Sequence, residues 1–211
     1  MAANRQGTGF GLRERKKRQT HNRIRDAAVS LFVSYGFDNT TVDAIALEAG
    51  ISKPTLFNYF PSKAAILHEL LDSMDARFVS YITAELHNVA STQDRLQDFM
   101  MRSATDIMET PALTRLLMVE GFGAIGDTGT SKARFSLLQQ AMEKLVRAGR
   151  KQGDVRKDYP IDLLVLMLVG GYLQVLLNWL SDQEYDLKKN LRNTARFLGE
   201  AIAPPINTQE N

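Results

Sequence analysis

The sequence of 211 residues contains no cysteine, one tryptophan and six prolines. The absence of cysteine excludes disulfide bonds and thiolate metal sites, and it fits a reducing cytoplasm, where we expect the protein to act. No long alternation of apolar and polar residues occurs, so nothing indicates a β-strand. With 44% hydrophobic and 24% charged residues, the composition is that of a folded globular protein with a sizeable core.

The sequence also lacks motifs that carry enzymatic or metal chemistry. No nucleophile motif of the G-x-S-x-G type is present. The histidines, His21, His68 and His87, have no carboxylate or histidine partner at metal-ligand spacing. The glycine-rich stretch 123–132 has threonine where a phosphate-binding G-K-[ST] loop requires lysine, and no strand precedes it. We therefore expect no enzyme, no metal and no cofactor.

Charge is distributed unevenly along the chain. The first 25 residues contain eight basic residues and one acid, Glu14, whereas the whole chain has 26 Lys and Arg against 24 Asp and Glu. The remainder is therefore net acidic. A basic end on an acidic body suits a protein that meets nucleic acid at that end, although a basic tail that is merely solvated gives the same pattern.

Hydrophobic periodicity and capping signals predict helices along the whole chain. The first covers 15–35. Two short helices follow it, one over 42–49 and one that begins after Ser52 and ends before Pro61. The helices then lengthen, and they are predicted over 63–87, 92–109, 111–122, 131–152, 160–180 and 186–202.

The two short helices have the pattern of a helix-turn-helix. Gly50 stands in the tight turn, where a left-handed residue is needed, and Ala46 is small enough for the helices to cross closely. The shared core would be filled by Ile45, Ile51 and Leu56. In such a motif the second helix enters the major groove of DNA with its N-terminal residues nearest the bases. The sequence therefore predicts a DNA-binding segment.

A family resemblance is carried by residues 40–67, TTVDAIALEAGISKPTLFNYFPSKAAIL. This stretch resembles the DNA-binding segment of the TetR family of transcriptional regulators. The preceding RIRDAAVSLFVSYGFDNTT is similar to the first helix of that family and its link to the motif. The resemblance covers about residues 20–70. The remainder resembles the family only in its size and its helices.

The resemblance implies an all-α fold in two domains. A three-helix DNA-binding domain would cover 20–65, and a larger antiparallel helical domain for effector binding and dimerisation would cover 66–203. A flexible basic arm is expected over 1–19 and a flexible tail over 204–211. The arm would contact phosphates or a minor groove, or would stay disordered.

The resemblance assigns backbone contacts within the motif. Thr41, at the start of the first motif helix, would bind a phosphate through its hydroxyl and the free N–H groups behind it. Tyr59 and Lys63 would bind further phosphates. Phe57 stands where the family more usually has tyrosine. We expect Phe57 either to keep an apolar contact with DNA while losing a phosphate hydrogen bond, or to pack in a partly buried position.

Bases would be read from the second motif helix. The resemblance places Lys53 and Thr55 at its leading end, nearest the base edges, and Asn58 one turn further on. Asparagine can pair with adenine through two hydrogen bonds, so Asn58 is the candidate for specificity. Lys53 alternatively is only solvated. Leu56 and Phe60 are assigned to the core under the motif and are excluded from the site.

The segment 160–180 is apolar nearly all round. Asp162, Gln174 and Asn178 interrupt it, leaving fewer than the roughly 18 to 20 apolar residues of a membrane span, so we expect no membrane contact. Such a helix is buried on every side, as at a subunit interface. The resemblance implies that 160–180 and 186–202 form a homodimer interface, and a dimer suits a palindromic DNA operator.

A small-molecule effector, largely apolar, is implied for the long-helix region. Methionine and aromatic side chains suit an adaptable apolar pocket, and they suit a plain core equally well. Arg102 and Glu120 are possible polar anchors. The candidate pocket wall consists of Met100, Met101, Met108, Leu117, Met118, Phe122, Phe135, Leu138, Tyr172 and Trp179.

The implied function is a ligand-responsive transcriptional regulator. It would be a repressor that binds its operator as a homodimer and is released by the effector through different affinities for two states. One alternative is the same DNA-binding regulator controlled by a protein partner without a small molecule. A more remote alternative is a helical carrier or enzyme with a solubilising basic tail.

Overall fold

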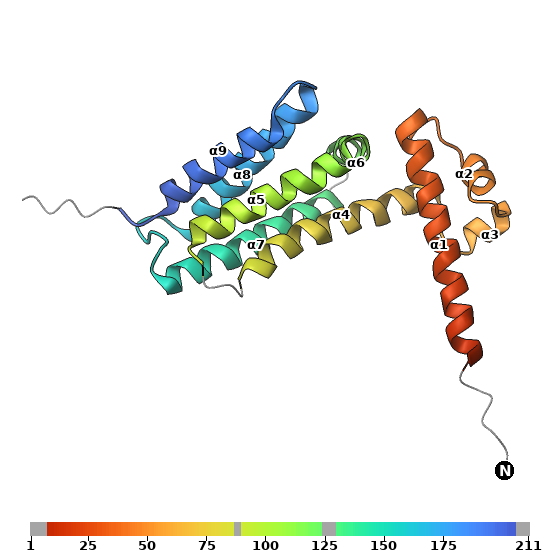
Figure 1. The fold of residues 1–211 in the computed structure, drawn as a ribbon, viewed down its shortest axis with the longest axis horizontal. Coiled ribbons are helices and arrows are strands. Elements are labelled where there is room, and N and C mark those ends of the chain that lie inside the picture. The colour runs from red at the N-terminus through yellow and green to blue at the C-terminus, as the bar shows by residue number, and fades with distance from the viewer. Residues whose placement is uncertain (1–7, 87–89, 124–129, 206–211) are drawn as a thin grey trace, which may run out of the picture. The chain divides into compact units, whose positions relative to one another are not determined.

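A computed structural model of the chain describes residues 8–86, 90–123 and 130–205. The secondary structure in these ranges consists of helices with no strand, which confirms the all-α prediction (Figure 1). The helices are α1 (Thr8–Tyr35), α2 (Val42–Glu48), α3 (Lys53–Phe57), α4 (Lys63–Glu85), α5 (Thr92–Glu109), α6 (Pro111–Gly123), α7 (Thr130–Gln152), α8 (Ile161–Ser181) and α9 (Leu187–Ile202).

Capping residues set helix ends where the sequence predicts them. The Oγ of Ser91 accepts a hydrogen bond from the N–H of Asp94 at 3.0 Å and begins α5, and that helix ends at Glu109, just before Pro111. The side chain of Asp186 caps α9 in the same way, by accepting from the N–H of Lys189 at 2.9 Å. Each cap satisfies an N–H that the helix itself leaves unpaired.

The first helix is longer than predicted. A flexible arm was expected over 1–19, yet α1 begins at Thr8. Nothing in 12–19 stops a helix, because these residues include Arg, Lys, Glu and Gln, which are good helix formers, and no proline. Residues 8–19 are therefore helical where an arm was predicted, and the flexibility of this arm stays a prediction. Residues 1–7, and 206–211 of the expected tail, lie outside the described residues.

Contacts between residues divide the chain into two units. Unit 1 comprises residues 1–71 and 112–119, and unit 2 comprises 72–111 and 120–211. The sequence suggests a single boundary after residue 65. Part of α6 belongs to unit 1 although it follows α5 in the chain, and such a return is not visible in the order of helices.

Unit 1 is built from α1, α2, α3 and the first turns of α4, with part of α6. α2 packs against both α1 and α3 (Figure 1). Its core is fully buried and apolar. The core includes Ile24, Ala28 and Phe32 of α1, Ile45 of α2, Leu56 of α3 and Ile66 of α4.

Unit 2 is a group of long helices. α5 packs against α7 and α9, and α8 packs against α7 and α9. Because the segment 182–186 joins α8 to α9 directly, these two neighbours run antiparallel. A β-carbon at Gly171 of α8 would lie 2.9 Å from Leu198 Cδ1 of α9, so the two helices approach closely there.

Helix α8 is long and apolar enough to cross a membrane by length and composition alone, and 44% of its apolar window is buried in the structure. Its inner face packs within unit 2. Large apolar side chains on its outer face are exposed, namely Leu163, Leu166, Met167 and Leu177. Gly170 lies on this helix with no atom within 4 Å of a β-carbon built on it. We call these five residues the outer face of α8.

Candidate nucleic-acid interface and effector region

The connection between α2 and α3 is a tight turn closed by backbone hydrogen bonds. Gly50 has φ +63°, a left-handed conformation that glycine adopts without steric cost. Its N–H donates to Leu47 O at 3.0 Å, and the N–H of Ile51 donates to Ala46 O at 3.0 Å. This pair of bonds is the Schellman arrangement that ends a helix at glycine. The predicted helix-turn-helix is present.

Side-chain caps fix both helices of the motif. Thr41 Oγ1 accepts from the N–H of Ala44 at 3.1 Å and begins α2. Ser52 Oγ accepts from the N–H of Thr55 at 3.3 Å and begins α3. The hydroxyls of Ser52 and Thr55 also lie 2.8 Å apart, so Thr55 is held by the cap. Thr41 is exposed and Thr55 is half-buried.

Helix α3 has two distinct sides. Leu56 and Phe60 are buried, at 0% and 3% exposure, which confirms that they belong to the core under the motif. Lys53 and Asn58 are exposed, and Phe57 is 44% exposed. The short helix is thus held by protein on one side, and of the predicted base-reading residues Lys53 and Asn58 are exposed while Thr55 is half-buried.

Lys53 forms an ion pair within the motif. Its Nζ lies 2.9 Å from Asp43 Oδ2 of α2, and both side chains are largely exposed. An exposed pair of this kind is worth about 1 kcal/mol or less, so Lys53 can leave Asp43 for DNA at little cost. Asp43 was missed by sequence reasoning, because a ten-residue separation becomes a contact only through the turn at Gly50.

The ammonium group of Lys63, predicted to bind a phosphate, already has partners within unit 1. Its Nζ donates to Phe37 O at 2.5 Å and to Asp38 O at 3.3 Å, and it lies 4.3 Å from the centre of the Phe37 ring. The ammonium group therefore fastens the loop between α1 and α2 to the start of α4. An ammonium group has three donors, so one donor remains for a phosphate.

His21 supports the end of the motif, a role not predicted from the sequence. Its ring stacks on Phe60 with centroids 4.8 Å apart, and the centroid of the Tyr59 ring is 6.4 Å away. His21 Nε2 lies 3.0 Å from Glu69 Oε2 of α4, and Arg25 Nε lies 3.2 Å from Glu69 Oε1. This cluster holds Tyr59 at the point where α3 meets α1 and α4.

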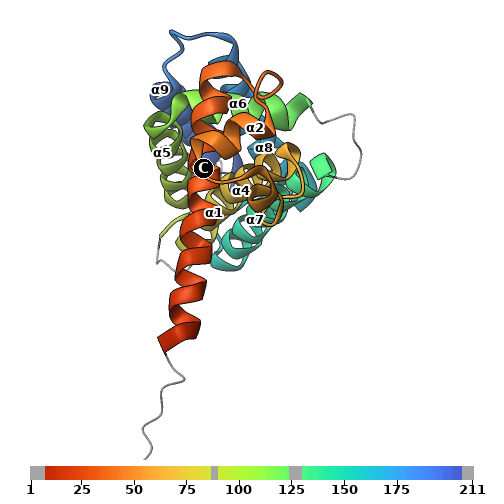
Figure 2. The ribbon, with the colours of Figure 1, turned by 90° about the vertical axis from the view of Figure 1, so that its right-hand side faces the viewer.

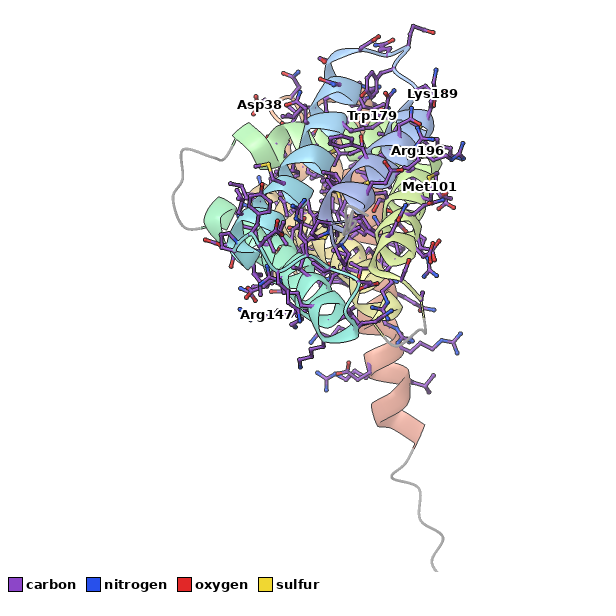
Figure 3. All side chains as sticks on the ribbon, turned by 90° about the vertical axis from the view of Figure 1, so that its left-hand side faces the viewer. Asp38, Met101, Arg147, Trp179, Lys189 and Arg196 are labelled. Carbon is purple, nitrogen blue, oxygen red and sulfur yellow. The ribbon has the colours of Figure 1, made fainter. Side chains whose placement is uncertain are left out.

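The ten candidate effector residues have different surroundings in the described part of the chain. Met100, Tyr172 and Trp179 are buried in the core of unit 2, whereas Met108 is exposed and Leu138 is half-buried. Leu117 and Met118 belong to unit 1 by their contacts. The side chains of Phe122 and Phe135 lie outside the described residues. Figure 3 labels Met101 on α5 and Trp179 on α8.

One hollow of about 390 Å³ contains Met101 and the anchor candidate Arg102. Its lining is mixed, with carboxylates, an arginine and a threonine beside an aromatic ring and a methionine. Arg77 Nη2 lies 3.6 Å from Asp106 Oδ2 at this place. Burial and the nearby Asp106 carboxylate raise the pKa of Tyr81. We call this the α5 hollow; its lining residues are Tyr81, Asp98, Met101, Arg102, Thr105, Asp106 and Glu109.

A second hollow, of about 630 Å³, lies between α7 and α8. It contains Glu143 and Arg147, which form an ion pair, and the apolar Leu166 of the outer face of α8. The interior of unit 2 also holds two buried hydroxyls, those of Ser103 and Tyr172, which interact with each other and have no further hydrogen-bond partner among the described residues. Burial raises the pKa of Tyr172, so its phenol stays neutral.

Comparison with known proteins identifies the family. Residues 24–70 match the family model of bacterial regulatory proteins, tetR family. A Mycobacterium tuberculosis protein named as a mycofactocin biosynthesis transcriptional regulator, MftR, is 27% identical over 201 residues, which cover 89% of this chain and 93% of MftR. The nucleoid occlusion factor SlmA of Haemophilus influenzae is 32% identical over 82 residues, and this match spans only 38% of SlmA and 39% of this chain.

The fold is shared with a solved repressor. SmeT, the repressor of the Stenotrophomonas maltophilia multidrug efflux pump SmeDEF, matches with a TM-score of 0.76 over 88% of this chain and 92% of that chain, at 22% identity. SmeT has also been solved in complex with triclosan. The match over 24–70 covers the helix-turn-helix described above, and the likeness to MftR and SmeT extends over most of the chain. Through residues 24–70, which match the family model, the chain belongs to the TetR family of bacterial regulatory proteins.

Proposed function

We propose that this protein is a ligand-responsive transcriptional repressor that acts in the cytoplasm and binds a palindromic operator as a homodimer. The observation that carries the proposal is the two-sided α3. One side is anchored by Leu56 and Phe60, and the other presents Lys53, Phe57 and Asn58 to solvent. A short helix so arranged, after a tight glycine turn, is suited to lie in the major groove.

Base contacts come from α3 in this proposal. Asn58 follows the last residue of α3 and is exposed, so its amide is free to pair with a base edge. Lys53 leaves its ion pair with Asp43 and binds DNA instead. Phe57 lacks the hydroxyl of a tyrosine, and at 44% exposure its ring offers an apolar contact, such as one with a thymine methyl.

Backbone contacts come from the ends of the neighbouring helices. Thr41 is exposed at the start of α2, and its hydroxyl accepts one bond from Ala44 while keeping its own hydrogen to donate. Lys63 has one donor left beyond Phe37 and Asp38. Tyr59 is held by the His21 cluster. These groups contribute affinity for any sequence and set the position of α3.

The outer face of α8 supports a homodimer. Four large apolar side chains are exposed along one helix, and an apolar face of this kind marks a protein interface more often than a solvated surface. Gly170 costs about 1 kcal/mol of helix stability relative to alanine, and a β-carbon at this position would meet no described atom within 4 Å. Close approach of a second copy at Gly170 would explain why this position has no side chain. We propose that α8, with α9, forms this interface, and that no membrane covers it.

We propose that the effector binds in unit 2. SmeT, which shares the fold, binds triclosan in a solved complex. In this chain the α5 hollow has an aromatic ring and a methionine beside three carboxylates and one arginine. That lining suits a small ligand with an apolar part and a cationic group better than a polyanion. The ligand acts by binding more tightly to the state that fits the operator less well.

The DNA proposal is tested with an operator selected from random-sequence duplexes by the purified protein. We expect one palindromic sequence to be enriched and its binding to weaken steeply as salt rises. Binding without any sequence preference would contradict the proposal. The effector is tested by screening small molecules for release of that operator and for a raised melting temperature. If a broad screen, with cationic and anionic amphiphiles included, gives no release, control by a protein partner becomes the better explanation.

The dimer is tested with matched substitutions of two exposed leucines. Leu166 on the outer face of α8 is 52% exposed, and Leu137 on α7 is 47% exposed. We expect Leu166→Glu to give a folded monomer and Leu137→Glu to leave the dimer intact, because only the first charge would be buried in the interface. Sedimentation measures the mass, and circular dichroism verifies the helix content. A Leu166→Glu dimer as tight as the unmodified protein would rule out this face.

A further inference from the structure

The N-terminal turns of α1 have no function in the proposed reading of DNA by α3. Every residue from Gly11 to Gln19 is exposed, and from Gly11 onward the first buried residue of α1 is Ile24. Figure 1 shows these turns running past α2 and α3 without a neighbouring helix, and Figure 2 shows the same. We call residues 11–19 the α1 extension.

The α1 extension is strongly basic. It contains one acid, Glu14, and its five cations are Arg13, Arg15, Lys16, Lys17 and Arg18. None of these five cations forms a hydrogen bond or ion pair with any described residue, whereas Arg25, further along α1, pairs with Glu69. Their charge is therefore available to an external partner.

Helical spacing distributes this charge around the whole axis. Successive residues of an α-helix are turned by about 100°, so Arg13 and Lys17 share one side while Arg15, Lys16 and Arg18 point to the others. Arg13 and Lys17 are four residues apart, and like charges at that spacing destabilise a helix. No apolar burial offsets the repulsion, since Leu12 is 57% exposed. The five cations of the extension therefore have no anionic partner among the residues that the structure describes.

We infer that the α1 extension is a second DNA contact, which binds phosphates beside the half-site that α3 reads. The inference rests on the proposed function only for the identity of the polyanion. The extension is about 14 Å long, and duplex DNA carries about one charge per 1.7 Å, so about eight phosphate charges lie along that length. The supply of phosphates thus exceeds the five cations that the extension offers.

The helical form decides which part of DNA is contacted. A helix with its side chains is about 10 Å or more across, which fits the major groove, about 12 Å wide, and not the minor groove, about 6 Å wide. An extended arm could enter a minor groove, but this helix lies along the phosphates or across the major groove. With cations on all sides, it can neutralise phosphates of both strands without reading bases. The contact is therefore independent of sequence.

The first test compares two triple variants of the full-length protein. Arg15→Ala/Lys16→Ala/Lys17→Ala removes three cations of the extension and keeps good helix formers. The matched control, Lys144→Ala/Lys151→Ala/Lys157→Ala, removes three exposed cations of unit 2. Binding to the selected operator and to an unrelated duplex of equal length is measured from 50 to 200 mM salt. Circular dichroism and sedimentation verify that both variants are folded and associate as the unmodified protein does.

We expect the slope of log affinity against log salt concentration to be smaller by about 2.7 per protomer in the extension variant, and its affinity for both duplexes to fall alike. Between 50 and 200 mM salt, the DNA affinity of the unmodified protein would then fall about 40-fold more than that of the variant, counted per protomer. The control keeps the unmodified slope. An unchanged slope in the extension variant overturns the inference. So does a variant that loses binding only to anionic lipid vesicles while binding DNA normally.

The second test shortens the DNA. Removing base pairs that flank the operator should lower the DNA affinity of the unmodified protein. The affinity of the extension variant should not change, because this variant no longer contacts the flanking phosphates. Equal losses for both proteins overturn the inference. A failure of the proposed function gives a different result from a failure of this inference. If the unmodified protein selects no operator, α3 is not a reader, whereas selection of an operator with no effect of the extension variant removes only the second contact.

Discussion

The two units expose different chemistry on the same kind of helical frame. The free side of α3 in unit 1 carries Lys53 and Asn58 beside one aromatic ring, whereas the outer face of α8 in unit 2 carries aliphatic side chains and methionine. Hydrogen-bond donors and cations suit a hydrated polyanion. A row of apolar side chains suits burial against protein. The comparison teaches that the type of exposed side chain, and not the helix itself, indicates the partner.

The units also differ in how they are held together. The helix-turn-helix of unit 1 is fixed by contacts between residues close in sequence, such as the caps at Thr41 and Ser52. Unit 2 depends on distant contacts. The N–H and hydroxyl of Thr92 donate to the carboxylate of Asp154 at 2.6 and 2.9 Å, across 62 residues. A substitution that disrupts contacts close in sequence should therefore destabilise unit 1 first, and one that disrupts distant contacts should destabilise unit 2 first.

The largest effect is expected from Leu56→Ala in unit 1. The side chain is 0% exposed beneath the motif, so its truncation costs about 3 kcal/mol of unfolding free energy and removes the support of α3. Leu47→Ala, on α2, is the matched control, because Leu47 is 82% exposed and the change costs less than about 0.5 kcal/mol. Denaturant unfolding measures both, and operator binding should be lost only for Leu56→Ala. Equal costs would contradict the burial assigned to Leu56.

A smaller effect is expected from Gly149→Ala in unit 2. The new β-carbon would lie 2.2 Å from Thr92 Oγ1 and 2.4 Å from Val155 Cγ2, so α5 or the segment after α7 must shift. Overpacking of this kind costs about 2 kcal/mol, or roughly 4–8 °C of melting temperature. Gly11→Ala, where nothing lies within 4 Å, is the control and should lose no stability.

The two substitutions sharpen the contrast between the units when they are followed by hydrogen exchange. Amides of α2 and α3 should lose protection first in Leu56→Ala, and amides of α5 and α7 first in Gly149→Ala. If both variants lose protection throughout the chain, the two units unfold together. The difference between local contacts in unit 1 and distant contacts in unit 2 would then have no effect on their relative stability.

Much of the fold could be predicted because its signals are local. Capping residues and prolines such as Pro111 mark helix ends, and the fixed pattern of 40–67 determines the turn and the two sides of α3. The start of α1 was missed, because a run of good helix formers contains no stop signal. The return of 112–119 to unit 1 and the hydrogen bonds of Lys63 to the loop at Phe37 were missed as well. These depend on segments far apart in the sequence.

The effector residues were beyond sequence reasoning for a different reason. Met100 and Met101 are neighbours with the same chemistry, yet Met100 is buried in the core while Met101 lines the α5 hollow. The carboxylates that line this hollow, such as Asp98 and Asp106, appear in the sequence as ordinary polar positions of an amphipathic helix. Composition therefore does not indicate which side chains of α5 line the hollow.

The free side of α3 is tested by comparing Asn58→Ala with Tyr59→Ala. Asn58→Ala should lower discrimination at one operator position by about 1–2 kcal/mol, because a base loses its paired hydrogen bonds. Tyr59→Ala should weaken binding to all sequences alike, since the ring lies at the backbone end of the motif beside His21. Competition titrations with single-base operator variants separate the two. Equal losses at every base for Asn58→Ala would remove its reading role.

The smallest effect is expected from Asp43→Asn, which releases Lys53. Loss of this exposed ion pair costs the folded protein less than about 1 kcal/mol. Operator affinity should rise several-fold, because Lys53 no longer gives up a partner when it meets DNA. Glu48→Gln, also exposed on α2, removes an equal charge and should raise affinity less, because Glu48 does not hold Lys53. The difference between the two variants should shrink as salt rises, since exposed charges are screened. If they raise affinity equally, only net charge matters, and Lys53 is a solvated residue with no specific role in the groove.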